Sequence, residues 1–151
     1  AVIEHSRNVL GLSTANSTEI DRDTKYPVIS IMDNQKKIIN KGGTMRLGSW
    51  RCDLKKGSLA YSVYRKNQIF ERHRHRYEYN NDYMKKLEDS GLVATGINPD
   101  TELVEIIENI NNKWFIGVQY HPEFKSTVLN PHPLFKSFMK ASLERFKNSR
   151  V

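Results

Sequence analysis

A histidine and a glutamate two residues apart, His121 and Glu123, are the side chains of this sequence best suited to catalysis. They follow an apolar run at residues 114–118 that predicts a strand, and on extended backbone residues i and i+2 project from the same face. Pro122 lies between them and disfavours helix at His121. A carboxylate bound to one imidazole nitrogen leaves the other nitrogen free to act as a base. The pair therefore supplies two of the three members of a Cys-His-Glu triad.

The third member, a nucleophilic cysteine, is missing from the sequence. The single cysteine, Cys52, lies between Arg51 and Asp53 and has none of the Gly-x-Cys-x-Gly pattern that produces an exposed nucleophile turn. Free cysteines are more often buried and behave as small hydrophobic residues. We interpret Cys52 as structural and expect no nucleophile in these 151 residues.

The His-Pro-Glu segment at residues 117–124 resembles the class I (triad) glutamine amidotransferases, in which this tripeptide follows a strand in the same way. Three further strings narrow the resemblance to the amidotransferase domain of the CTP synthase family: ANSTE at 15–19, GGTMRLG at 42–48 and ERHRHRYE at 71–78. The resemblance covers residue 1 to about residue 147. It implies an α/β fold of the class I amidotransferase type, which is layered and flavodoxin-like.

The resemblance also implies a reaction and a set of site residues. Glutamine would be hydrolysed through a thioester, with His121 as base toward the thiol and acid toward ammonia, and with Glu123 holding the imidazole. Arg76 matches an arginine of the glutamine site and suits a forked contact with the substrate carboxylate, and Tyr77 follows it. Glu19 matches an acid of the same site, where it would face the substrate ammonium group.

In the resembling family, the helix expected at residues 1–11 comes directly after the nucleophile turn. We therefore expect residues 1–151 to be the C-terminal portion of an amidotransferase domain, incomplete on its N-terminal side and lacking the nucleophile turn and the synthetase domain. No cofactor is expected in this portion, and without the nucleophile it should be inactive alone. The intact enzyme would aminate UTP with ATP and Mg²⁺, would form a tetramer, and would take GTP as activator, with Arg46 as the effector-site residue.

One alternative remains open at this point, and a metal site is considered and set aside. The chain could be an amidotransferase-like module without a nucleophile that binds a partner or a ligand, and the residues encoded before Ala1 would decide between these readings. His73 and His75 share a strand face at a spacing that a metal could use, but no suitable third ligand lies close in sequence. We expect no metal site.

Composition places the chain among single soluble domains, with 38% hydrophobic and 27% charged residues. No apolar run approaches the roughly 18 residues of a membrane span. The net charge of +7 would allow nucleic acid, nucleotide phosphates or an acidic partner domain, but most lysines are scattered, and only Arg72, Arg74 and Arg76 cluster, on one strand face by alternation. We expect no nucleic-acid or membrane partner, and the lone cysteine fits a reducing cytoplasm.

Hydrophobic periodicity and turn residues predict a mixed α/β domain. Helices are expected at residues 1–11, 59–64, 81–90 and from 133 onward, and strands at 27–32, 44–54, 72–79, 92–97, 103–108 and 114–120. Residues 13–23 and 33–43 are expected to be polar loops.

Overall fold

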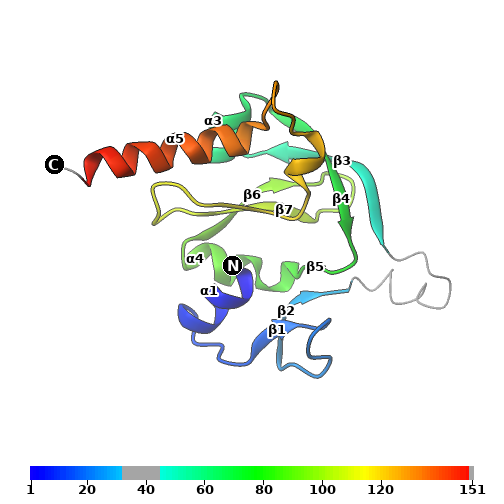
Figure 1. The fold of residues 1–151 in the computed structure, drawn as a ribbon. Helices are drawn as coiled ribbons and strands as arrows, with labels where there is room; N and C mark the ends of the chain where they lie inside the picture. Colours follow the sequence, from blue (N-terminus) through cyan, green and yellow to red (C-terminus); the bar gives the residue numbers. More distant parts are fainter. Residues whose placement is uncertain (32–44, 150–151) are drawn as a thin grey trace.

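A computed structural model describes residues 1–31 and 45–149 (Figure 1). The helices are α1 (Val2–Asn8), α3 (Leu59–Tyr64), α4 (Met84–Asp89) and α5 (Pro133–Asn148), with short 3-10 helices η2 (Asn81–Tyr83) and η3 (Pro122–Lys125). The strands are β1 (Ala15–Ser17), β2 (Tyr26–Ser30), β3 (Arg46–Leu54), β4 (Gln68–His75), β5 (Glu78–Tyr79), β6 (Leu92–Ile97), β7 (Val104–Asn109) and β8 (Ile116–Val118). The predicted mixed α/β domain is confirmed.

The larger sheet has the strand order β4-β3-β6-β7-β8, and all of its neighbouring strands are antiparallel. The sheet curls, so that the chain leaving the edge strand β8 comes back to the opposite edge strand β4. There the His121 amide donates to the Arg72 carbonyl at 2.9 Å. The concave side is filled by a buried cluster that also contacts α3 and α5: Cys52, Leu54, Ala60, Ile69, Ile106, Tyr120 and Leu134. The curl therefore places the end of β8 next to β4.

The smaller sheet has the order β1-β2-β5, with β1 parallel and β5 antiparallel to β2. It lies with α1 below the larger sheet in Figure 1. A second buried cluster joins α4 to β6 and β7: Tyr79, Leu87, Leu92, Ala94, Val104 and Ile107. Val2 from α1 and Leu10, just after α1, pack against it. The two sheets meet where β4 leads into β5.

The prediction of a single strand over residues 72–79 is wrong, because this segment contributes to both sheets. β4 ends at His75, and Glu78 and Tyr79 pair with β2 in the smaller sheet. His75 Nδ1 lies 3.1 Å from the Tyr77 carbonyl, which bridges the bend between the two strands. Arg76 consequently lies in the connection between the sheets and not on a strand face.

Most other expectations agree with the structure, and the differences have local causes. The helix at 59–64 is confirmed, and the Ser58 hydroxyl caps it by accepting from the Tyr61 amide at 3.0 Å. The predicted loop at 13–23 contains the short strand β1, which forms because β2 lies beside it. The loop expected at 33–43 and positions 42–44 of the second motif lie outside the described residues.

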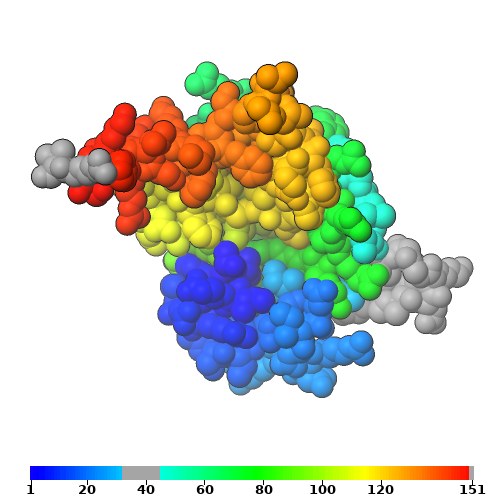
Figure 2. Space-filling view, viewed as in Figure 1, coloured from blue at the N-terminus to red at the C-terminus, as the bar shows by residue number. Residues whose placement is uncertain are grey.

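Helix α5 begins at Pro133 as predicted, with the His132 side chain accepting from the Leu134 amide. Only Leu134 of its predicted apolar face is buried, and the others are 42–57% exposed: Phe135, Phe138, Met139, Leu143 and Phe146. In Figure 2 the far end of α5 projects beyond the body of the molecule. Within residues 1–31 and 45–149, no helix has the length and apolar character needed to cross a membrane.

Candidate active site

The predicted pairing of His121 with Glu123 is confirmed. Nδ1 of the imidazole lies 2.6 Å from Oε1 of the carboxylate. The carboxylate can only accept, so Nδ1 carries the proton and Nε2 is left as the basic nitrogen. The hydrogen bond from His121 lowers the pKa of Glu123, which keeps the carboxylate ionised. The two side chains are 37% and 56% exposed, so the pair is open to a substrate.

The local backbone differs from the expected strand end. Predicted strand 114–120 is observed only as β8 (Ile116–Val118), and Pro122 opens the 3-10 helix η3. His121 is the N-cap of η3, with extended φ and ψ of −109° and 90°. The tight turn of η3 brings Glu123 back toward the imidazole, while the Phe124 ring stacks on it at a centroid distance of 4.8 Å. The pair therefore depends on a helical turn that follows the strand.

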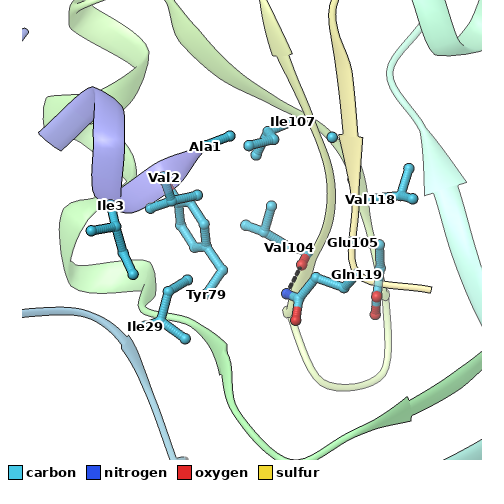
Figure 3. Close-up of a pocket in the computed structure, with 11 residues that line it drawn as sticks. Ala1, Val2, Ile3, Ile29, Tyr79, Val104, Glu105, Ile107, Val118 and Gln119 are labelled. Atoms are coloured by element: carbon cyan, nitrogen blue, oxygen red, sulfur yellow. Dashed lines mark hydrogen bonds between the residues drawn. The ribbon is translucent and has the colours of Figure 1, made fainter. Parts of the chain in front are cut away.

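A pocket of about 240 Å³ lies between the start of α1 and the end of β8. In Figure 3, Val2 and Tyr79 lie on one side of it and Val118 and Gln119 on the other. The Gln119 side chain donates to the Val104 carbonyl, which fixes the chain two residues before His121. The start of α1 and the segment leading to His121 thus face one space.

The smaller sheet brings two of the predicted glutamine-site residues to one end. Ile29 on β2 lies beside Ser17 on β1 and beside Tyr79 on β5. Because β1 runs parallel and β5 antiparallel to β2, Glu19 and Tyr77 both lie beyond the same end of the sheet. Their placement beyond the same end of the sheet agrees with a shared role, although binding of glutamine by either residue remains a prediction.

Arg76 immediately precedes Tyr77 in the bend between the sheets, and its side chain is exposed. Among the described residues its guanidinium has no ion pair or hydrogen-bond partner. Arg72 and Arg74 are exposed on β4, as alternation predicted, whereas Arg76 lies beyond the strand. An exposed guanidinium without an internal acceptor is suited to bind an anionic ligand, and its assignment to glutamine stays a prediction.

Arg46, the predicted effector-site residue, is turned inward. It is 5% exposed, lies 2.5 Å from the Glu105 carboxylate and 3.8 Å from that of Glu78, and its guanidinium lies over the Trp50 ring. In the described part of the chain these contacts leave the guanidinium engaged with two carboxylates. Its placement therefore gives no support to activator binding, which stays a prediction.

Two histidines connect this buried cluster to the bend that carries Arg76. His75 Nδ1 contacts the Tyr77 carbonyl and so carries a proton, which leaves its Nε2 to accept from His73 Nδ1 at 2.8 Å. Nε2 of His73 then faces Glu105 Oε2 at 3.4 Å. Burial raises the pKa of Glu105, although Arg46 opposes this shift. A proton shared between Glu105 and His73 would satisfy both buried atoms.

These partners explain the two histidines without a metal ion. Within residues 1–31 and 45–149, no group of three or more histidine, cysteine or acidic side chains has the geometry to hold one. Burial, followed by the charge of Arg46, lowers the pKa of His73 to about 3 and that of His75 to about 4. Both rings are therefore neutral at physiological pH.

Acid should destabilise the fold through His73. The unfolded chain protonates this residue near its usual pKa of 6.5, whereas the folded chain does so only near 3. The contribution of neutral His73 to the free energy of unfolding is therefore fully present above pH 6.5, and it is lost as the pH falls from 6.5 toward 3. The positive charge of a protonated His73 would be opposed by Arg46, His75 and His121, while the Glu105 carboxylate faces the ring.

We expect His73→Gln to lose part of this acid sensitivity. The variant removes one titrating group, so its unfolding midpoint should fall less than that of the unmodified protein between pH 7 and pH 5. Thermal unfolding of the full-length protein across this range measures the difference. Parallel pH profiles for the two proteins would contradict the assignment of a neutral buried His73.

Cys52 is fully buried in the concave core, as its interpretation as a structural residue requires. Burial, followed by the charge of Glu105, raises the pKa of its thiol well above the usual range. A buried neutral thiol is a poor nucleophile, which agrees with the expectation that this chain supplies none.

Sequence reasoning missed the buried acids that surround the site. Glu71 and Glu105 are 3% and 0% exposed, and each contacts a histidine and a basic side chain. A carboxylate within an apolar run, as Glu105 is between Val104 and Ile106, was the available signal. Glu71 was read only as part of a motif, because its partners are remote in sequence.

Comparison with known proteins agrees with this geometry. The family model described as "Glutamine amidotransferase class-I" matches residues 6–141. The chain is 63% identical over its whole length to a CTP synthase of Christiangramia forsetii, and 56% identical over 94% of its length to that of Aquifex aeolicus. It spans 28% and 27% of these two proteins, so it corresponds to about a quarter of the curated relatives.

A solved structure extends the likeness to the fold. The chain is similar to the glutaminase domain of a Trypanosoma brucei CTPS with bound acivicin, with a TM-score of 0.88 and 39% identity, over 95% of this chain and 56% of that one. The predicted fold class is confirmed by this match. The family model covers most of the chain, and the similarity holds in sequence and in structure. The chain belongs to the class I glutamine amidotransferase family.

Proposed function

We propose that this chain is the part of a CTP synthase glutaminase domain that carries the general base, and that the complete protein hydrolyses glutamine to supply ammonia for the amination of UTP. The observation that carries the proposal is the His121–Glu123 hydrogen bond of 2.6 Å at an exposed site. Its support from relatives is the similarity to CTP synthases of several bacteria.

The chemistry follows from the state of the imidazole. Nε2 of His121 takes the proton of a cysteine thiol, and the thiolate attacks the side-chain amide carbon of glutamine. The same proton then goes to the departing ammonia, which leaves a thioester that water hydrolyses to glutamate. Glu123 keeps Nδ1 protonated and stabilises the imidazolium that forms in between.

The thiol must come from outside these 151 residues, because Cys52 is fully buried in the core and is not exposed to a substrate. The pocket between the start of α1 and Gln119 is lined both by the first residue and by the segment that leads to the base. A nucleophile attached before Ala1 would approach from this side. Residues 1–151 alone would therefore form no thioester intermediate and show no glutaminase activity.

Substrate recognition is assigned to the end of the smaller sheet. Arg76 would bind the glutamine carboxylate, Glu19 its ammonium group, and Tyr77 would line the same site. The ATP- and Mg²⁺-dependent steps would belong to a synthetase domain of the same protein. Activation by GTP and assembly into a tetramer are further expectations for the complete enzyme.

The test compares the complete protein with residues 1–151 alone. The complete protein should release glutamate from glutamine and form CTP from UTP with either glutamine or ammonium as nitrogen source. Residues 1–151 alone should release no glutamate. A complete protein that forms CTP from ammonium and fails to hydrolyse glutamine would contradict the glutaminase assignment, and release of glutamate by residues 1–151 would contradict the external nucleophile.

A further inference from the structure

We propose that Glu71 is a positioning residue for the His121–Glu123 pair, acting through buried hydrogen bonds that reach one end of the segment carrying the pair and through an ion pair with Lys125 at the other end. The inference rests on the proposed glutaminase function and adds a residue to which that function assigns no role. Glu71 lies on β4 and is 3% exposed.

The carboxylate of Glu71 is the meeting point of three elements. Its Oε1 lies 3.3 Å from the Tyr64 hydroxyl at the end of α3 and 3.1 Å from His132 Nε2 at the N-cap of α5. Its Oε2 lies 3.6 Å from Lys125 Nζ at the end of η3. A fourth residue joins through Tyr64, whose hydroxyl is 2.9 Å from that of Tyr120.

The direction of each hydrogen bond follows from its partners. His132 Nδ1 accepts from the Leu134 amide, so its Nε2 carries the proton and donates to Glu71. The single proton of Tyr64 goes to Glu71, so Tyr120 donates to Tyr64. The network therefore runs from Tyr120 through Tyr64 to Glu71, with His132 as a second donor, and the carboxylate is its final acceptor.

The residues that contact this network flank the His121–Glu123 pair in the sequence. Tyr120 immediately precedes His121, and Lys125 follows Glu123 by two residues within η3. Lys125 also donates to the Phe70 carbonyl next to Glu71, and the His121 amide donates to the Arg72 carbonyl on its other side. Three consecutive residues of β4 thus hold the segment from 120 to 125.

The pair itself is too exposed to fix its own position. An ion pair open to solvent is weak, whereas buried hydrogen bonds to a carboxylate are strong and directional. The orientation of the imidazole is therefore set by the buried residues on either side of it. Loss of the Glu71 charge should loosen η3, because Lys125 loses its ion-pair partner and His132 loses its hydrogen-bond acceptor.

The experiment uses Glu71→Gln and Tyr64→Phe in the full-length protein, with His121→Ala as reference. Misplacement of a base by a fraction of a bond length costs rate more than binding, so kcat with glutamine should fall roughly ten- to hundredfold while KM changes little. CTP formation from ammonium should be unchanged. Tyr64→Phe should show the same pattern with a smaller loss, because the Glu71 contacts to Lys125 and His132 remain.

Asp53→Asn is the matched control. This carboxylate lies on the neighbouring strand β3, accepts from Arg51 and Gln68, and is outside the network, so the variant should keep normal kinetics. A loss in Glu71→Gln that is equal with glutamine and ammonium, or unchanged glutamine kinetics in that variant, overturns the positioning role. Failure of His121→Ala to reduce glutamine use overturns the proposed function instead.

Discussion

Replacement of His121 by alanine in the full-length protein should lower glutamine-dependent CTP formation by at least roughly 10²-fold, the usual loss when a general base is removed. The imidazole Nε2 is the basic atom of the site, because Nδ1 donates to Glu123 at 2.6 Å. The thiol would then stay protonated, and neither attack on the amide nor release of ammonia would have a proton carrier. Steady-state kinetics with saturating glutamine measures the loss.

Ammonium is the internal control for this variant. External ammonia bypasses glutamine hydrolysis, so ammonium-dependent CTP formation in His121→Ala should match that of the unmodified protein. His121 is partly exposed and contributes no buried ion pair, so its removal should leave the fold intact. An equal loss with both nitrogen sources would mean that the variant is misfolded or that His121 has another role.

A second variant separates the role of the carboxylate from that of the base. In the proposed mechanism Glu123 acts only through His121, so adding Glu123→Ala to His121→Ala should cause little further loss. Two independent losses that multiply in the double variant would contradict the coupling of the pair. The same assay, applied to both single variants and the double variant, provides this comparison.

The His121–Glu123 hydrogen bond was predictable from sequence because its geometry is local. His121 and Glu123 are two residues apart, and any extended or tight-turn backbone there allows their side chains to meet. Their hydrogen bond was therefore predicted although the 3-10 helix η3 was not. Likewise, helix 59–64 and strand 92–97 were predicted with correct ends, since Ser58 and the glycine at 91 mark them locally.

The position of Arg76 was not predictable in the same way. Alternation over residues 72–79 is typical of one strand, and only pairing of Glu78 and Tyr79 with β2 breaks it. Pairing between strands about fifty residues apart leaves no periodic signal in either segment. The roles of Glu71 and Glu105 were hidden for the same reason, because their partners come from distant elements.

These long-range contacts give the site its organisation. The larger sheet holds the base, with His121 anchored to β4, while the bend leaving β4 carries Arg76 toward the smaller sheet. One strand thus connects the proposed base to the proposed carboxylate-binding residue. Substitutions on the outer face of β4 should therefore leave glutamine use unchanged, whereas substitutions in the bend at the end of β4 should impair it.

Replacement of Arg76 by alanine should weaken the response to glutamine roughly ten- to hundredfold, because a charge-assisted hydrogen bond contributes about 1.5–3 kcal/mol. The effect should fall on KM for glutamine, since the guanidinium would bind the substrate carboxylate away from the reacting amide. Arg76 is exposed and has no ion pair within the described residues, so its loss should not lower stability. Arg76→Lys should restore only part of the affinity, because an ammonium group cannot form the forked contact.

Arg74→Ala is the matched control, since Arg74 is also an exposed arginine, two residues earlier on the outer face of β4. It removes the same charge from the same cluster, and it should leave KM for glutamine unchanged. Ammonium-dependent activity and thermal stability should be normal in both variants. Equal effects of Arg74→Ala and Arg76→Ala would indicate a diffuse contribution of positive charge. Unchanged glutamine kinetics in a stable Arg76→Ala protein would exclude Arg76 from the substrate site and leave the arginines as an interface or effector surface.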